Sequence, residues 1–422
     1  MDKLIWKTEV RDVKDLIPWK QNPRKISKVA MEKLKQKIIE NGFHSVIVID
    51  TDNTILSGNQ RKSALLQLGV QQVYVLIPNR KLNDIERSKI AIESNITDGD
   101  WDFEILKEFD IELLTEVGFP KSDLADIWDN NITTKVENFD VEKELKNIKE
   151  PRVKTGDIIL LGKHKIICGD STDPQVLKRL FQDKQASMIY SDPIYNINLD
   201  YDKGLGGKQN YGGTVTDNKT DEEYKSFLKQ SMSAALAVSK KDVHVFYWNT
   251  EQHIWIVQVL YRELGIENKR VCLWVKNGHN PTPLVAFNKC YEPCIYGTKG
   301  HPYLSKKEQG LTEIMNKEIT TGNDSLDEVN IWTAKRVSGK DYKHATTKPV
   351  ELHEKAIRRC TLPGDIILDS FLGSGSTLIA AEQLQRVVYG VEMEPVFCDL
   401  IISRYEKLTG NKAQIISYEK AS

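Results

Sequence analysis

The chain has 422 residues and a formal net charge of −1, with 40% hydrophobic and 28% charged residues. It is too long for one typical domain, and the composition fits a soluble globular protein with two or three domains. A charge near zero excludes a general attraction to nucleic acid. Any DNA contact must therefore come from local basic patches.

The sequence predicts neither export nor a membrane segment. Residues 1–9 lack the pattern of a signal peptide, and no apolar run approaches membrane-spanning length. Six scattered cysteines favour reduced thiols and a cytoplasmic location. Cys290 and Cys294 form a C-x3-C pair without a second pair nearby, so we predict no metal site.

Residues 1–82 are predicted to form a small α+β domain. Apolar residues recur at helical spacing over 27–40, and strand-like runs cover 45–50 and 73–77. A turn at Gly58 opens a second predicted helix.

Two motifs in this domain suggest a ligand. Asn22-Pro23-Arg24 and Gly58-Asn59-Gln60-Arg61 resemble the N-terminal domain of ParB-like proteins, which is related to the sulfiredoxin fold. The resemblance implies that the Gly58 turn, Arg24 and Arg61 contact a phosphate or nucleotide, which suits exposed amides and guanidinium groups. Gln60-Arg61 stands here in place of the usual Glu-Arg pair. The alternative to a phosphate or nucleotide contact is that Arg61 is simply solvated.

Residues 83–150 are predicted to connect two domains. The first part, up to about residue 130, is polar and helix-like. The stretch 131–151 is rich in charge and poor in large apolar residues, which is typical of a linker.

From residue 151 onward, strand-like and helical stretches alternate. This alternation predicts a doubly wound, largely parallel α/β sheet. Strands are expected over 157–161, 165–168, 187–191, 243–249 and 270–277, and helices over 174–181, 221–238 and 250–264. The glycine-rich stretch 204–216 is either a mobile loop over a site or an ordinary surface loop.

The candidate catalytic segment follows the strand that begins near residue 187. The strand ends in Asp192-Pro193-Ile194-Tyr195, which brings a carboxylate, a free carbonyl and an aromatic ring to the carboxyl edge of the sheet. Ligands of open α/β sheets bind at that edge. An ordinary strand-to-turn transition would look similar, so the segment needs a cofactor site elsewhere.

A second candidate site lies near the C-terminus. Asp369 ends a predicted strand, and the turn Phe371-Leu-Gly373-Ser-Gly375 leads into a helix. The next strand ends at Glu392, whose carboxylate could accept hydrogen bonds from ribose hydroxyls. The third glycine of a dinucleotide fingerprint is missing, which favours a nucleoside without phosphates.

Together, the Asp-Pro-x-Tyr and the later Phe-x-Gly-x-Gly segments resemble the β-class amino-methylating DNA methyltransferases. In that class the cofactor motif follows the catalytic motif, a circular permutation of the usual order. The resemblance implies a Rossmann-like class I methyltransferase domain over residues 151–415 that binds S-adenosyl-L-methionine. A third segment, His344-Ala-Thr-Thr347-Lys348-Pro349, resembles the His-Pro-Thr-x-Lys-Pro stretch of the class and departs from it at Ala345. The implied cofactor residues are Asp170, His344, Thr347, Lys348, Asp369, Phe371, Gly373, Gly375, Ser376, Thr377 and Glu392.

The same resemblance implies that Asp192, Pro193 and Tyr195 are catalytic. The carboxylate of Asp192 and the carbonyl of Pro193 would accept hydrogen bonds from an adenine N6 amine, which is a poor nucleophile, and stabilise the positive charge that develops on it. Tyr195 would stack on a base flipped out of the duplex. The family usually has Asp-Pro-Pro-Tyr, so Ile194 is a departure that leaves the geometry less constrained.

Double-stranded DNA is the implied partner, and residues 277–343 correspond to the target-recognition region of the class. Basic residues in and beside it predict phosphate contacts, with a solvated loop as the alternative. They are Lys276, Lys335, Arg336, Lys340 and Lys343. A homodimer and a cognate restriction nuclease are further partners compatible with the resemblance.

Two other functions remain open at this point. The chain could methylate cytosine N4 or RNA, since an Asp in the first motif position is only a tendency of adenine enzymes. It could also be a DNA-binding, partition-type protein whose methyltransferase fold is a degenerate scaffold.

Overall fold

The computed structural model describes residues 3–21, 26, 28–94, 103–106, 109–131, 133–135, 137, 139–197, 217–280, 289–305, 331–333 and 348–418. The chain divides into two compact units, Met1–Asn131 and Ile132–Ser422. No helix within the described ranges is both long and apolar enough to cross a membrane.

The first unit contains a mixed five-stranded sheet in the order β1-β5-β3-β4-β2. The strands are β1 (Trp6–Asp12), β2 (Ile17–Pro18), β3 (Ile47–Ile49), β4 (Thr54–Ser57) and β5 (Gln72–Pro78). Alternation in β5 turns Val73, Val75 and Ile77 into the core. The predicted small α+β architecture is therefore confirmed.

Helices flank this sheet and continue through the predicted connector. They are η1 (Val13–Asp15), α1 (Lys28–Asn41), α2 (Asn59–Gln67), α3 (Asp84–Glu93), α4 (Phe103–Leu106), α5 (Ile111–Glu116) and α6 (Lys121–Asn131). A capping box between Asn83 and Glu86 starts α3. The helices of 83–131 thus belong to the same compact unit as the sheet.

The second unit is built on a ten-stranded sheet in the order β12-β10-β11-β9-β8-β13-β14-β7-β6-β15. Its strands are β6 (Ile158–Leu161), β7 (His164–Cys168), β8 (Ala186–Ser191), β9 (Ser239–Trp248), β10 (Glu267–Asn280), β11 (Lys289–Lys299), β12 (Ile331–Thr333), β13 (Ile366–Asp369), β14 (Val387–Glu392) and β15 (Gln414–Ile416). Strands β6 and β11 run against the direction of the others. The sheet is largely parallel, as predicted.

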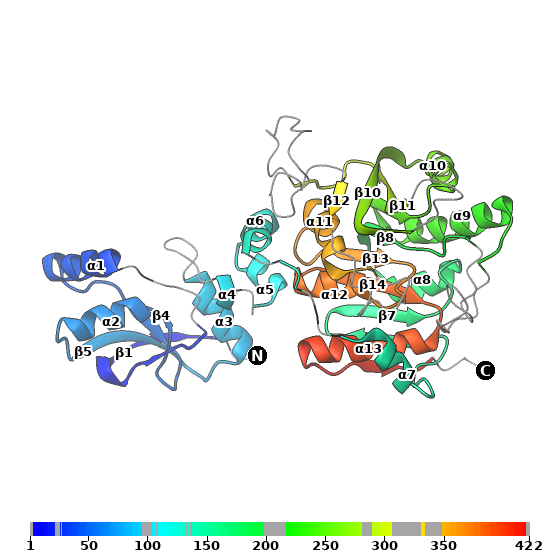
Figure 1. The fold of residues 1–422 in the computed structure, drawn as a ribbon. Helices are drawn as coiled ribbons and strands as arrows, with labels where there is room; N and C mark the ends of the chain where they lie inside the picture. Colours follow the sequence, from blue (N-terminus) through cyan, green and yellow to red (C-terminus); the bar gives the residue numbers. More distant parts are fainter. Residues whose placement is uncertain are drawn as a thin grey trace, which may run out of the picture. The chain divides into compact units, whose positions relative to one another are not determined.

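Helices cover both faces of this sheet (Figure 1). They are α7 (Val141–Asn147), α8 (Pro174–Phe181), α9 (Asp221–Ala237), α10 (Ile254–Glu263), α11 (Val350–Cys360), α12 (Ser376–Gln383) and α13 (Pro395–Thr409). The apolar residues of α8, α9 and α10 form one buried cluster with the sheet, and those of α11, α12 and α13 form a second. The doubly wound α/β class is confirmed.

The strand order brings the two candidate segments together. β8, which precedes Asp192, pairs in parallel with β13, which ends at Asp369. On the other side of β13 lies β14, which ends at Glu392. Figure 1 shows β13 and β14 of the C-terminal part between β8 and β7 of the earlier part. After β8 the chain passes through α9 to β9 on one side, and after β13 it passes through α12 to β14 on the other side. The connections therefore diverge between β8 and β13, which makes this point a topological switch point of the sheet.

The segment before residue 150 is anchored to the second unit. Glu137 accepts a hydrogen bond from the buried Arg404 guanidinium, with Nε at 2.6 Å, and the Thr134 amide donates to Glu354 at 2.8 Å. Much of this stretch, predicted as a linker, is therefore held by charged and polar contacts that its composition did not reveal.

Candidate active site

The candidate catalytic segment leaves the sheet at the end of β8. All six residues of β8 are buried, whereas the Asp192 side chain is 29% exposed and therefore accessible to a ligand. The Tyr195 hydroxyl donates to Asp192 Oδ1 at 2.7 Å. Burial, together with the charges of Asp192 and Glu292, raises the pKa of Tyr195 well above its ordinary value, so its hydroxyl remains a donor.

A lysine from the other end of the unit reaches the same carboxylate. Lys348 is buried, and its ammonium donates to Asp192 Oδ2 and, at 2.9 Å, to the Tyr195 hydroxyl oxygen. It also lies 3.6 Å from Glu292 Oε2 and 4.7 Å from the centre of the Trp248 ring. The site therefore holds one cation between two carboxylates and two aromatic rings.

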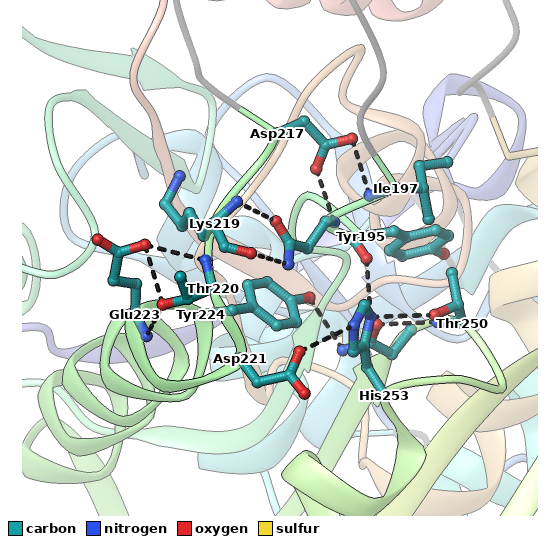
Figure 2. Close-up of polar contacts among 12 residues, drawn as sticks. Tyr195, Ile197, Asp217, Lys219, Thr220, Asp221, Glu223, Tyr224, Thr250 and His253 are labelled. Carbon is teal, nitrogen blue, oxygen red and sulfur yellow. Dashed lines mark hydrogen bonds and ion pairs between the residues drawn. The ribbon is translucent and has the colours of Figure 1, made fainter.

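The loop after Tyr195 is held at its base by the start of the next described segment (Figure 2). Asn196 adopts a left-handed φ of 54°, and its amide donates to the buried Asp217 carboxylate at 2.6 Å. The Asn196 side chain exchanges two hydrogen bonds with the Lys219 backbone, at 2.8 and 2.7 Å. These contacts fix the direction in which the chain leaves the site.

A second set of contacts holds the backbone of the catalytic segment (Figure 2). The Tyr224 hydroxyl donates to the Ile194 carbonyl at 2.7 Å, and His253 Nδ1 lies 3.1 Å from the Tyr195 carbonyl oxygen. A carbonyl oxygen only accepts, so Nδ1 carries the proton in this contact. The position of Tyr195 is thus determined from α9 and from the turn before α10.

Ile194 stands where the resembled family has proline. Its side chain is partly buried against the cluster that α8, α9 and α10 form with the sheet. Its carbonyl is the acceptor for Tyr224. Side-chain packing and this hydrogen bond constrain the backbone at a position where a proline ring would otherwise restrict φ.

The glycine turn after β13 contacts the end of β8 directly. The Ser370 amide donates to the Ser191 hydroxyl at 3.4 Å, which ties the two strand ends together. Gly373 and Gly375 both have left-handed φ values, 51° and 78°. A Cβ on Gly375 would meet Ile401 Cγ1 at 2.9 Å, whereas a Cβ on Gly373 would meet no heavy atom within 4 Å. Gly373 therefore leaves open space beside the turn.

Two acids at this edge have strongly shifted pKa values. Burial raises the pKa of Asp369 to about 7, although the Phe371 amide and Thr377 oppose the shift. Burial likewise raises the pKa of Glu392 to about 7, against hydrogen bonds from the Glu394 and Gly373 amides. Both carboxyl groups therefore change charge near neutral pH.

Two further predicted cofactor residues, Asp170 and Ser376, lie at the strand and helix ends beside this turn. Asp170 is exposed just beyond β7, and its carboxylate accepts from the Thr172 amide at 2.8 Å. The amide of the preceding residue, Gly169, donates to the Glu392 carbonyl at 2.9 Å, which places the end of β7 beside the end of β14. Ser376 is held by His353 Nε2, at 2.9 Å from its hydroxyl.

Several predicted site residues lie outside the described residues. These are Arg24, Lys335, Arg336, Lys340, Lys343, His344 and Thr347, as are the loop 204–216 and most of the target-recognition region 277–343. Lys276 lies on β10, but its side chain is outside the described part. Within the described ranges, no group of three or more His, Cys, Asp or Glu side chains could hold a metal ion.

In the first unit, Gly58 caps α2 with a left-handed φ of 108°. Arg61 Nη1 donates to the Val46 carbonyl at 2.6 Å, so the guanidinium is partly engaged by the protein itself. Burial lowers the pKa of Arg61.

Sequence reasoning did not identify Glu292, Asp217 or His253. Glu292 offered one signal, because it is a charged residue beside the buried Pro293 and Cys294 on a strand of the large sheet. Asp217 and His253 had none, since their contacts with residues 195–197 span 20 or more residues of the chain.

Comparison with known proteins gives a consistent result. The family model described as DNA methylase, of the N6/N4 type, matches residues 186–403. The chain is 28% identical over 240 residues to the type II methyltransferase M2.MboI of Moraxella bovis, covering 54% of this chain and 84% of the relative. It is 27% identical over 277 residues to the type II methyltransferase M2.DpnII of Streptococcus pneumoniae, covering 61% and 98%. The crystal structure of an M1.HpyAVI–SAM complex matches with a TM-score of 0.41 and 21% identity, over 57% of this chain and 97% of that one.

Proposed function

The chain belongs to the N6/N4 DNA methylase family, and from this premise we propose that it methylates the N6 amine of an adenine flipped out of double-stranded DNA. The observation that carries the proposal is the parallel pairing of β8 with β13, which brings Asp192 to the same sheet edge as Asp369 and the glycine turn. An amine acceptor and a nucleoside-binding turn at one edge are what amine methylation requires.

The residues at the turn fit S-adenosyl-L-methionine. Open space beside Gly373 lies next to the Glu392 carboxyl group, which could accept from ribose hydroxyls. Asp170 would lie near the adenine, and Asp369, Phe371, Gly375, Ser376 and Thr377 would complete the pocket. His344 and Thr347 are proposed for the methionine part, whereas the ammonium of Lys348 contacts Asp192 instead. When bound, this cofactor supplies a methyl group activated by its sulfonium.

The catalytic residues would act on the target base. The Asp192 carboxylate and the Pro193 carbonyl would each accept a hydrogen bond from one N–H group of the amine. These two hydrogen bonds would direct the nitrogen lone pair toward the methyl group and stabilise the positive charge that develops on the nitrogen. Tyr195 would stack on the flipped base. The contacts of Tyr224 and His253 support this role, because they fix the backbone of the catalytic segment.

We extend the proposal to the first unit and to partners. The Gly58 turn, Arg61 and Arg24 would form a ParB-like phosphate or nucleotide site. Lys276, Lys335, Arg336, Lys340 and Lys343 would contact DNA phosphates, and affinity would then fall steeply with salt. The enzyme would work on DNA in the cytoplasm, as a homodimer and beside a cognate restriction nuclease.

Sequencing of modified bases in plasmid DNA from an expressing host tests the function. N6-methyladenine at one recurring sequence is the expected result, with unmodified DNA from a host that carries an empty vector as the control. N4-methylcytosine would instead identify a cytosine enzyme. DNA without any new methylation would contradict the proposal.

A further inference from the structure

Both carboxylate oxygens of Asp192 already have donors inside the protein. Oδ1 accepts from the Tyr195 hydroxyl at 2.7 Å, and Oδ2 accepts from the Lys348 ammonium. Under the proposed function, the same carboxylate must accept an N–H of the target amine. A carboxylate oxygen can accept two hydrogen bonds, but the ammonium on Oδ2 neutralises the charge that would stabilise the amine, so Asp192 becomes the stronger acceptor once Lys348 moves away.

A second carboxylate, that of Glu292, lies within reach of the same ammonium. Glu292 Oε2 lies 3.6 Å from Lys348 Nζ and 3.4 Å from the Tyr195 hydroxyl. The Lys348 side chain is only 6% exposed, and the Trp248 and Tyr195 rings flank its ammonium at 4.7 and 5.3 Å. The ammonium is thus confined to the space between Asp192 and Glu292.

We propose that Lys348 is a positioning residue that covers the Asp192 carboxylate between turnovers and passes to Glu292 when the target amine arrives. The proposal rests on the proposed function, and it assigns Glu292 as the acceptor that makes the exchange possible. Stranding a buried cation without a carboxylate is strongly unfavourable. With Glu292 present, the ammonium remains paired before and after the base enters.

The local electrostatics agree with this exchange. Burial alone lowers the pKa of Lys348, but the charges of Asp192 and Glu292 more than offset it and raise that pKa. The ammonium is therefore charged throughout the neutral range. Its transfer to Glu292 also moves a positive charge away from Asp192 as positive charge develops on the amine.

A double-mutant cycle of Glu292→Gln and Lys348→Met tests the proposal. Alone, Glu292→Gln is expected to slow single-turnover methylation by about tenfold or more, because the ammonium stays on Asp192. In the Lys348→Met background, Glu292→Gln should have no further effect. The cofactor Kd, measured by calorimetry, should stay within about twofold of wild type in all three variants. Glu351→Gln, on α11 near Lys348, is the matched control and should behave as wild type.

Base capture gives a readout that a merely structural role would not move. When 2-aminopurine replaces the target base, its fluorescence rises as the base leaves the duplex. Glu292→Gln should reduce this rise by about the same factor as it reduces the methylation rate. An equal effect of Glu292→Gln in both backgrounds would overturn the proposal. So would a more than tenfold weaker cofactor Kd in Lys348→Met, because that result would make the lysine a cofactor ligand.

Failure of the proposed function can be told apart from failure of this inference. If the wild-type protein methylates no DNA, the proposed function is wrong. The contact between Lys348 and Asp192 is then tested by thermal unfolding of DNA-free Lys348→Met, Asp192→Asn and the double variant. Strongly non-additive changes in Tm are expected for two groups in direct contact. Additive changes would overturn the resting contact and the proposal with it.

Discussion

The Gly373 amide donates a 2.7 Å hydrogen bond to the Glu392 carboxylate, which joins the turn after β13 to the end of β14. The other oxygen of Glu392 accepts from the Glu394 amide at 2.9 Å. The acid proposed for the cofactor ribose therefore also organises the turn on which the cofactor would lie. This double role makes the charge of Glu392 a variable that experiments can follow.

Cofactor affinity should depend on pH through Glu392. Its pKa of about 7 means that the acid is largely protonated at pH 6 in the free protein. Hydroxyl donors favour the carboxylate, so binding should release a proton, and affinity should rise about tenfold per pH unit below 7 and level off above it. Calorimetry between pH 6 and 8 measures this dependence.

Glu392→Gln provides the control, because it should bind more weakly and without the pH dependence. A flat wild-type profile would contradict the role of Glu392. If the affinity of Glu392→Gln for the cofactor still depended on pH, the responsible group would be Asp369, whose pKa is also about 7.

The two glycines of the turn should tolerate alanine differently. Gly375→Ala combines a φ of 78° with a Cβ 2.9 Å from Ile401 Cγ1, so it should cost about 2–3 kcal/mol of unfolding free energy. Gly373→Ala meets no atom within 4 Å and should cost only about 1 kcal/mol, from backbone strain alone. Urea unfolding of both variants compares them, and equal losses would show that contact with α13 is unimportant.

The base of the loop after Tyr195 should matter for catalysis rather than for cofactor binding. Asp217→Ala removes the acceptor of the Asn196 and Ile197 amides. Misplacement of the catalytic segment should then slow single-turnover methylation by about tenfold or more, while the cofactor Kd is unchanged.

Glu223→Ala is the matched control for Asp217→Ala. It removes the capping box of α9 and should cost about 1 kcal/mol of stability with no change in the rate of methylation. Comparable rates for the two variants would mean that the Asp217 contacts do not position Tyr195.

The contact between Glu137 and Arg404 should contribute strongly to the stability of the second unit. Arg404 is 4% exposed, so Glu137→Ala leaves a buried guanidinium without its carboxylate and should cost about 3 kcal/mol. Denaturant unfolding of the full chain measures the loss. The exposed Glu150→Ala should change stability by less than about 0.5 kcal/mol. An equally small effect of Glu137→Ala would show that this segment is only loosely attached.

Much of the fold was predictable because its signals are local. Buried strands such as 187–191 read as apolar runs, and glycine turns mark where helices begin. The short strands β12 and β15 were not predicted, since three residues are too few for an alternating pattern. Their pairing with β10 and β6 depends on the rest of the sheet.

The candidate site was predictable only in part. Asp192, Gly373 and Glu392 follow strands, and strand ends of a parallel sheet meet at one edge. The contact between Lys348 and Asp192 spans 156 residues of sequence, and that between Tyr195 and Glu292 spans 97. No local pattern reports pairs so far apart, and the sequence had suggested for Lys348 a role with the cofactor or with DNA phosphates.

Single-turnover methylation by Asp192→Ala tests the central claim most directly. The measurement uses a duplex that carries the modified sequence found in the plasmid, at saturating cofactor, with the cofactor Kd determined in parallel. We expect a loss of about 10²-fold or more in rate with an almost unchanged Kd, because the amine loses its acceptor while the turn is untouched. Methylation by Asp192→Ala at the wild-type rate would contradict the assignment of Asp192 as the catalytic acceptor.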